Sequence, residues 1–81
     1  MKVVVSATLK PDVLDPQGDA IRKACNTLGY DAVKKVRQGK LFELEIDVRD
    51  EKEALRLVGE IGERLLANTV IETYRIERIE G

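Results

Sequence analysis

The feature that most constrains the fold is the predicted strand Leu41–Arg49, in which apolar and charged residues alternate from Phe42 onward. Apolar side chains occupy every second position, and three carboxylates lie between them. Successive side chains of a strand point to opposite faces, so this pattern predicts a strand with one buried face and one acidic face. The buried face needs a second layer to cover it, and 81 residues suffice for only one such domain. We therefore expect residues 1–81 to form a single domain.

The remaining chain predicts three more strands and two helices. Strand patterns cover Lys2–Lys10, Ala32–Arg37 and Val70–Ile79, and helical patterns run from Pro16 to about Leu28 and from Asp50 to Asn68. The resulting order is β-α-β-β-α-β. This order predicts an α+β, ferredoxin-like two-layer sandwich, with a four-stranded, mainly antiparallel sheet and two helices on one of its faces.

Local signals mark the ends of both helices. Asp15 followed by Pro16 is typical of an N-cap and a first helical residue, and Gly29 is expected just after the end of that helix. Asp50 with Glu53 three residues later predicts a capping box for the second helix. Both helices are thus expected to begin at an aspartate.

The sequence Gln38-Gly39-Lys40 predicts a tight hairpin turn, in which Gly39 supplies a positive φ. The turn would connect the second and third predicted strands. Either register of this hairpin places Lys34 or Lys35 near Glu43 on the neighbouring strand.

Both helices carry an apolar stripe, which we expect to cover the sheet. In the first helix it comprises Ile21, Ala24, Cys25 and Leu28, so Cys25 is interpreted as a core residue. Gly59 and Gly62 interrupt the second helix. They indicate either close approach to a neighbouring element or simple tolerance of glycine.

Two strands have apolar residues on both faces. Val4 faces away from its apolar neighbours, and the apolar positions of the last strand change sides, which indicates a β-bulge or a strand contacted from both sides. A domain of this size buries a small core of its own. We therefore expect a homodimer or a higher homo-oligomer.

The composition argues against catalysis by this chain alone. It contains no His, one Cys and three aromatic residues, which excludes a Ser–His or Cys–His pair and a Cys-x-x-Cys metal site. The expectation is therefore no catalytic residue, no metal ligand and no cofactor bound by this chain. RNA binding through the sheet is also not expected, because the third predicted strand exposes carboxylates.

Charge and hydropathy limit the cellular compartment and the partners that we expect for this chain. The net charge of −1 combines +4 over residues 1–40 with −5 over residues 41–81. No apolar run approaches the roughly 18 residues of a membrane span, and the N-terminus lacks the pattern of a signal peptide. We expect a cytoplasmic protein without nucleic-acid or membrane partners.

The basic cluster Lys34, Lys35, Arg37 and Lys40 is either a solvated edge or a docking surface for an acidic partner or phosphorylated ligand.

Three segments in this order and spacing resemble the PurS family, the small subunit of phosphoribosylformylglycinamidine (FGAM) synthase. They are VLDPQG at 13–18, VRQGK at 36–40 and LLANTVIE at 65–72. The resemblance implies a non-catalytic subunit in purine biosynthesis. Such a subunit bridges the glutaminase PurQ and the synthetase PurL, which uses ATP and Mg, and assists ammonia transfer between them.

The resemblance also indicates residues for partner contact: Asp15, Pro16, Gln17, Gly18, Arg37, Gly39, Lys40 and Asn68. Arg37 and Lys40 flank the predicted hairpin tip and are the first candidates. Asp15, Pro16 and Asn68 also have a purely structural interpretation, at the start and end of helices. The alternative functions are a small-molecule-sensing regulatory domain and a bare dimerisation module.

Overall fold

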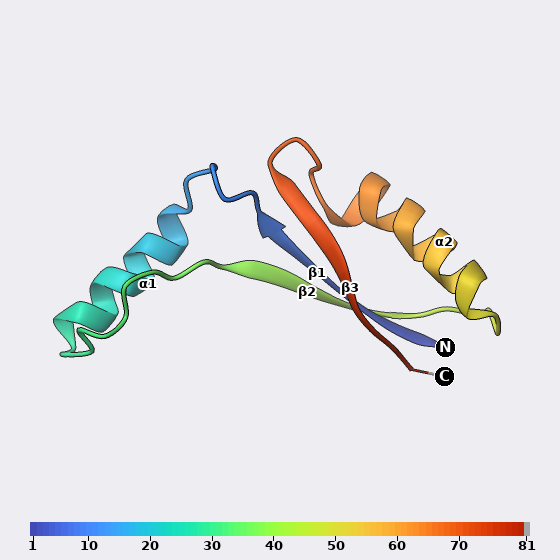
Figure 1. The fold of residues 1–81 in the computed structure, drawn as a ribbon, viewed down its shortest axis with the longest axis horizontal. Coiled ribbons are helices and arrows are strands. Elements are labelled where there is room, and N and C mark those ends of the chain that lie inside the picture. The colour runs from blue at the N-terminus through green and yellow to red at the C-terminus, as the bar shows by residue number, and fades with distance from the viewer. Residues whose placement is uncertain (81) are drawn as a thin grey trace.

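The computed structural model describes residues 1–80 as a three-stranded sheet with one helix packed against it and a second helix beyond its end (Figure 1). The elements in chain order are β1 (Lys2–Leu9), α1 (Pro16–Thr27), β2 (Gly39–Glu45), α2 (Glu51–Ile61), a π-helical turn (Gly62–Leu66) and β3 (Glu72–Glu80). The α+β class is confirmed. Gly81, the last residue of the expected domain, lies outside the described residues.

The sheet is built around β1, which pairs antiparallel with β2 on one side and with β3 on the other. β1 takes the central place because its apolar residues fill both faces: Val3, Val4, Val5 and Ala7 are all buried. α2 covers one face of this sheet. There Val58 joins Val3 and Val5 in the core, which is surrounded by Phe42, Leu44, Ile46, Leu66, Tyr74, Ile76 and Ile79.

The other face of the sheet is covered by its own long side chains. Val4 is 2% exposed and lies between its two cross-strand neighbours, Glu43 and Arg78. Lys2 forms an ion pair with Glu43 at 2.6 Å on the same face. The stems of such charged residues shield apolar surface while their heads stay in water. Burial of Val4 therefore does not require a second chain.

The expected bulge in the last strand is confirmed. The register between β1 and β3 shifts between Val4 and Val5, whose partners are Arg78 and Ile76. The intervening Glu77 is the extra residue, and its carboxylate accepts a hydrogen bond from Ser6 on β1.

The glycines of the second helix have different roles. A Cβ on Gly62 would lie 2.9 Å from the ring of Tyr74, whereas one on Gly59 would find its nearest neighbour at 3.8 Å. The Tyr74 hydroxyl donates a hydrogen bond to the carbonyl of Gly59. Close approach is thus confirmed at Gly62. The predicted capping box is wrong, because the Asp50 side chain forms no capping bond.

The predicted second strand and hairpin are wrong. Residues 32–38 belong to no strand of the described chain, and Gly39 is the first residue of β2, opposite Thr8 of β1. Gly29, and not Gly39, has a positive φ, of 97°. Because the chain runs straight through Gly39, Lys34 and Lys35 are carried away from Glu43, and Lys2 takes their place as its ionic partner.

The first helix forms where expected but does not cover the sheet. Its start at Asp15 and Pro16 is confirmed. It points away from the end of the sheet, and residues 28–38 return along it (Figure 1). We call α1 and residues 28–38 together the arm. The expectation of two helices on one face is therefore not met within a single chain.

The arm makes the molecule unusually long for its size. The radius of gyration is 16.0 Å, whereas a compact domain of this length would have about 12 Å. The expected burial of the first apolar stripe is also wrong: Ile21 is 45% exposed, Leu28 is 74% exposed and Cys25 is only half-buried. The side of α1 that carries Gly18 and Asn26 rests on residues 33–36, so most of the stripe is left without a covering element in this chain.

Candidate functional site

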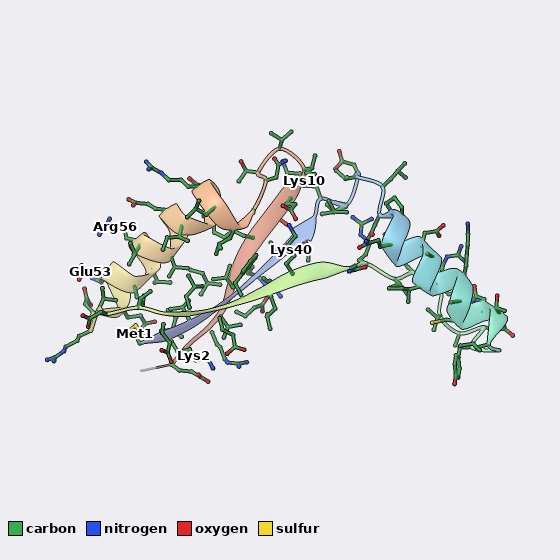
Figure 2. The ribbon with its side chains drawn as sticks, turned by 180° about the vertical axis from the view of Figure 1, so that it is seen from behind. Met1, Lys2, Lys10, Lys40, Glu53 and Arg56 are labelled. Atoms are coloured by element: carbon green, nitrogen blue, oxygen red, sulfur yellow. The ribbon has the colours of Figure 1, made fainter. Side chains whose placement is uncertain are left out.

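The residues of the three motifs meet where the arm joins the sheet. Three segments converge there, residues 9–18, 36–40 and 67–72, which we call the junction. Figure 2 shows Lys10 and Lys40 at this end of the sheet, with Met1 and Lys2 at the opposite end. The backbone N–H of Lys10 donates to the carbonyl of Ile71, which fastens the first segment to the third.

Asp15 connects the first and second segments of the junction. One carboxylate oxygen accepts the N–H of Gly18 at 2.9 Å and so caps α1, and the other accepts the N–H of Gln38 at 2.8 Å. The Gln38 and Gly18 bonds, with the nearby charge of Arg37, hold the pKa of the Asp15 carboxyl below its usual range. Asp15 is therefore ionised at neutral pH, with both oxygens engaged.

Arg37 strengthens the same connection. Its guanidinium donates to the carbonyls of Val13 at 3.1 Å, Lys10 at 2.9 Å and Leu9 at 3.3 Å. A planar guanidinium with several donors suits this arrangement, in which one side chain holds successive carbonyls of a loop. Arg37 thus fixes the loop between β1 and α1 instead of extending freely from a hairpin tip.

Two glycines allow the segments to lie this close. A Cβ on Gly18 would collide with the carbonyl oxygen of Val36, and one on Gly39 would be 2.7 Å from the Thr8 side chain and 2.9 Å from the carbonyl oxygen of Ala7. A Cβ atom does not come this close to backbone atoms in a packed protein. Gly18 therefore permits close approach between α1 and the returning segment, and Gly39 permits close approach between β2 and β1.

The third segment is organised by Asn68 and Glu72. The Glu72 carboxylate is nearly buried and accepts the N–H of Asn68 at 2.7 Å, while the Asn68 side chain accepts the N–H of Val70 at 3.2 Å. Lys40 lies 3.6 Å from the other carboxylate oxygen of Glu72. An ion pair therefore joins this turn to β2.

Two hollows flank the junction. The smaller, of about 180 Å³, is lined by Leu9, Asp15, Gln17, Gln38, Gly39, Lys40 and Glu72. The larger, of about 500 Å³, lies between the start of α1 and residues 34–37, and Pro16 and Arg37 are among its lining residues. Asp15 borders both hollows, so its carboxylate lies at the centre of the site.

The structure brings the eight predicted contact residues into this one region. Four of them line the smaller hollow: Asp15, Gln17, Gly39 and Lys40. Pro16 and Arg37 line the larger one, Gly18 is buried in the first turn of α1, and Asn68 is joined to the others through Glu72. Sequence reasoning missed Gln38 and Glu72 as members. Both lie within the quoted motifs, and that is the signal that could have identified them.

Hydrogen bonds within the junction engage two of its three carboxylates. Those of Asp15 and Glu72 accept backbone N–H groups, whereas Asp12 is exposed. Among residues 1–80, no group of three or more His, Cys, Asp or Glu side chains is arranged to hold a metal ion. In the same part of the chain, no helix combines the length and apolar character needed to cross a membrane.

Comparison of the sequence with known families gives one extensive match. The family described as PurS, phosphoribosylformylglycinamidine (FGAM) synthase, matches residues 2–80. The PurS subunit of FGAM synthase from Bacillus subtilis is 50% identical over 76 residues, which cover 94% of this chain and 89% of that protein. The corresponding subunit from Synechocystis is 45% identical over 79 residues, 95% of this chain and 79% of that one.

The fold is shared as well. The B. subtilis PurS structure superposes with a TM-score of 0.84 at 49% identity and covers 98% of both chains. A chain of the PurLQS structure from Thermotoga maritima gives a TM-score of 0.84 at 27% identity, covering 98% of this chain and 99% of that one. Because these matches span nearly the whole chain, they include the arm and the junction.

Proposed function

Because this chain belongs to the PurS family of FGAM synthase subunits, which act in purine biosynthesis, we propose that it bridges a PurL and a PurQ subunit. In this role it performs no chemistry itself. It holds the two larger subunits in the geometry in which ammonia passes from the glutaminase to the synthetase, and the synthetase alone uses ATP and Mg. We place this reaction in the cytoplasm.

The observation that carries the proposal is the likeness to a chain of PurLQS, which extends over 98% of this chain. The junction supports it, because the carboxylates of Asp15 and Glu72 are committed to backbone bonds that hold its three segments together. The competing idea of a small-molecule-sensing domain rests on topology alone, and fold by itself does not imply function. The relatives favour the subunit over the sensor.

The predicted contact residues divide into two groups. Lys40 and Gln17 line the smaller hollow with exposed side chains, so we assign them direct contact with a large subunit. Asp15, Gly18 and Arg37 hold the arm at its angle to the sheet, so we assign them a positioning role. Pro16 and Asn68 shape the helix start and the turn beside that surface.

We also propose that the chain works as a homo-oligomer, with a dimer as its basic unit. The support is the outward apolar stripe of α1, where Ile21 and Leu28 are exposed. A helix whose apolar stripe faces water has not found its packing partner. The length of the molecule supports the same view, because the arm contributes little to its own chain's core.

Reconstitution tests the bridging role. Purified PurL and PurQ, supplied with formylglycinamide ribonucleotide, ATP and glutamine, should produce FGAM slowly or not at all, and addition of this chain should restore the glutamine-dependent rate. Ammonia-dependent synthesis by PurL alone provides the control, since it needs no transfer between subunits. Full glutamine-dependent synthesis without this chain would falsify the bridging role.

A further inference from the structure

The connection from α2 to β3 is uncharged, although part of it lies in water. Residues 65–71, LLANTVI, contain no charged side chain in a chain of which 36% is charged. Two other stretches of seven residues, 3–9 and 24–30, also lack charge, and none is longer. The first is the buried strand β1, and the second carries part of the outward stripe of α1. The connection is the third such stretch, and its exposed part has no covering element in this chain.

Leu65 and Val70 form the exposed apolar part of this connection, which we call the turn surface. Leu65 is 80% exposed and Val70 is 78% exposed. Among the large hydrophobic residues of the described chain, only Leu14 is more exposed. Neither Leu65 nor Val70 lines either hollow of the junction. The turn surface is therefore distinct from the surface that the two hollows offer.

The π-helical turn decides that Leu65 faces water. The helical period places Leu65 two turns after the buried Val58, on the side of α2 that faces the sheet. In the structure Leu66 packs against the core in its place. The turn closes over five residues, because the N–H of Ala67 donates to the carbonyl of Gly62 at 3.0 Å. One extra residue rotates the following side chains by about 100°, and such turns are frequent at functional sites.

Hydrogen bonds hold the other half of the turn surface in place. The carbonyl of Asn68 accepts the N–H groups of Ile71 at 3.0 Å and of Glu72 at 2.7 Å. Its side chain accepts the N–H of Val70 at 3.2 Å. A surface that is fixed before binding loses little conformational freedom when a partner covers it. The turn surface can therefore be covered without reordering of the chain.

The absence of charge defines the chemistry of the partner. A partner that brought a charge onto Leu65 and Val70 would bury that charge without a counter-charge, which is unfavourable. The buried cores of protein interfaces are correspondingly depleted of charged residues. The complement of the turn surface is therefore an uncharged, apolar surface on another protein.

A chain that bridges two different proteins needs two surfaces that its partners can distinguish. The smaller hollow offers Gln17 and Lys40, which are polar and exposed. The turn surface is apolar and uncharged. A partner that suits one of them would leave polar groups unpaired on the other, and mismatches of this kind separate right from wrong partners. The two surfaces therefore suit two different large subunits.

We propose that the turn surface binds the large subunit that does not contact Gln17 and Lys40. That subunit covers Leu65 and Val70 with an uncharged apolar surface, and the two contacts together make the bridge. This inference rests on the bridging role proposed above and adds to it a second contact of different chemistry.

Leu65→Gln with Val70→Thr tests this assignment, because both substitutions keep the size of the side chain and make it polar. Sedimentation of the labelled chain with PurL, with PurQ and with both should show binding to one large subunit weakened at least about tenfold and binding to the other unchanged. Gln17→Ala with Lys40→Gln should show the reverse pattern. The matched control is Leu55→Gln, an exposed leucine earlier in α2, which should keep both subunits.

Hydroxyl-radical footprinting of the unmodified chain provides a second measurement that does not depend on a substitution. Mass spectrometry should find Leu65 and Val70 oxidised in the chain alone. Addition of the large subunit that binds the turn surface should protect both residues, whereas addition of the other should not. Leu55 serves as the internal control and should stay reactive throughout.

Several results would overturn the proposal while leaving the bridging role intact. Protection of Leu65 and Val70 in the chain alone would assign the turn surface to a contact between copies. Unchanged binding of Leu65→Gln with Val70→Thr, or continued oxidation with both large subunits bound, would show that no subunit covers it. Loss of the same subunit in both pairs of substitutions would make the two surfaces one. An unmodified chain that binds neither PurL nor PurQ in any mixture would instead overturn the bridging role itself.

Discussion

The carboxylate of Asp15 accepts a hydrogen bond from the backbone N–H of Gln38, 23 residues further along the chain, at 2.8 Å. The same carboxylate caps α1 through Gly18. One side chain thereby fixes both where the helix begins and how the segment returning from it enters the sheet. The angle between arm and sheet, and so the surface offered to partners, depends on this residue.

Asp15→Asn should loosen the entry to β2 while keeping the start of α1. Asparagine is a good N-cap and retains the oxygen that Gly18 needs, but its amide group replaces the oxygen that accepts from Gln38. We expect hydrogen exchange of the Gln38 amide to accelerate at least about tenfold. Without its acceptor, this amide can exchange through a local opening of the chain and no longer needs a larger unfolding event. Asp12→Asn, on the exposed loop, is the matched control. Unchanged protection of Gln38 would contradict this role.

The contribution of Asp15 should depend on pH with a definite sign. Its pKa lies below the ordinary value of 3.8, so the ionised form is favoured in the folded chain. The stabilisation is therefore complete above the unfolded pKa and is lost as pH falls through the folded one. Urea unfolding of the native chain and of Asp15→Asn should differ by a constant amount above about pH 5, and the difference should shrink as pH falls below the ordinary value of 3.8. If the two chains still differed in stability at the lowest pH, the ionised carboxylate of Asp15 would not be the source of the difference.

The two glycines of the second helix should respond oppositely to alanine. Gly62→Ala places a Cβ against the Tyr74 ring and should lower the free energy of unfolding by about 1–3 kcal/mol. Gly59→Ala makes only an ordinary van der Waals contact, 3.8 Å from the Tyr74 hydroxyl, and should raise it by up to about 1 kcal/mol through helix propensity. Chemical denaturation of both variants checks the pair. A shift of the same sign in both would refute the packing argument.

Arg37→Lys distinguishes positioning from direct charge contact. Lysine keeps the positive charge but cannot span the carbonyls of Leu9, Lys10 and Val13. If Arg37 positions the arm, Arg37→Lys and Arg37→Ala should weaken assembly with PurL and PurQ similarly, as measured by analytical ultracentrifugation. Lys23→Ala, which removes one exposed charge from α1, controls for net charge. Full assembly by Arg37→Lys would instead indicate that the charge itself meets a partner.

Glu72→Ala should destabilise the turn before β3. Glu72 is 8% exposed, and its loss leaves the N–H of Asn68 without its acceptor. A half-buried donor without a partner costs about 1–3 kcal/mol, so the midpoint of urea unfolding should fall accordingly. Glu80→Ala, near the exposed end of the same strand, should be close to neutral. Equal effects of the two substitutions would show that the destabilisation comes from the loss of a negative charge on β3 and not from the turn.

Much of the local structure follows from the sequence. The alternation in β1 and β2, the start of α1 at Asp15 and Pro16, and its end at Gly29 are governed by side chains within a few residues of each other. The motifs also identified the region of the candidate site, because the segments that carry them converge on the junction. Only Gln38 and Glu72 were overlooked as members of it.

The straight passage through Gly39 could be known only from the tertiary structure. Read locally, Gln38-Gly39-Lys40 is a good hairpin turn, and Ile21, Ala24 and Leu28 form a good core-facing stripe. The competing contacts come from far along the chain: Asp15 on Gln38, Arg37 on the carbonyls after β1, and Thr8 beside Gly39. Local propensity distinguishes conformations by only about 1 kcal/mol. Several long-range hydrogen bonds together exceed that difference, and they hold the arm away from its own sheet.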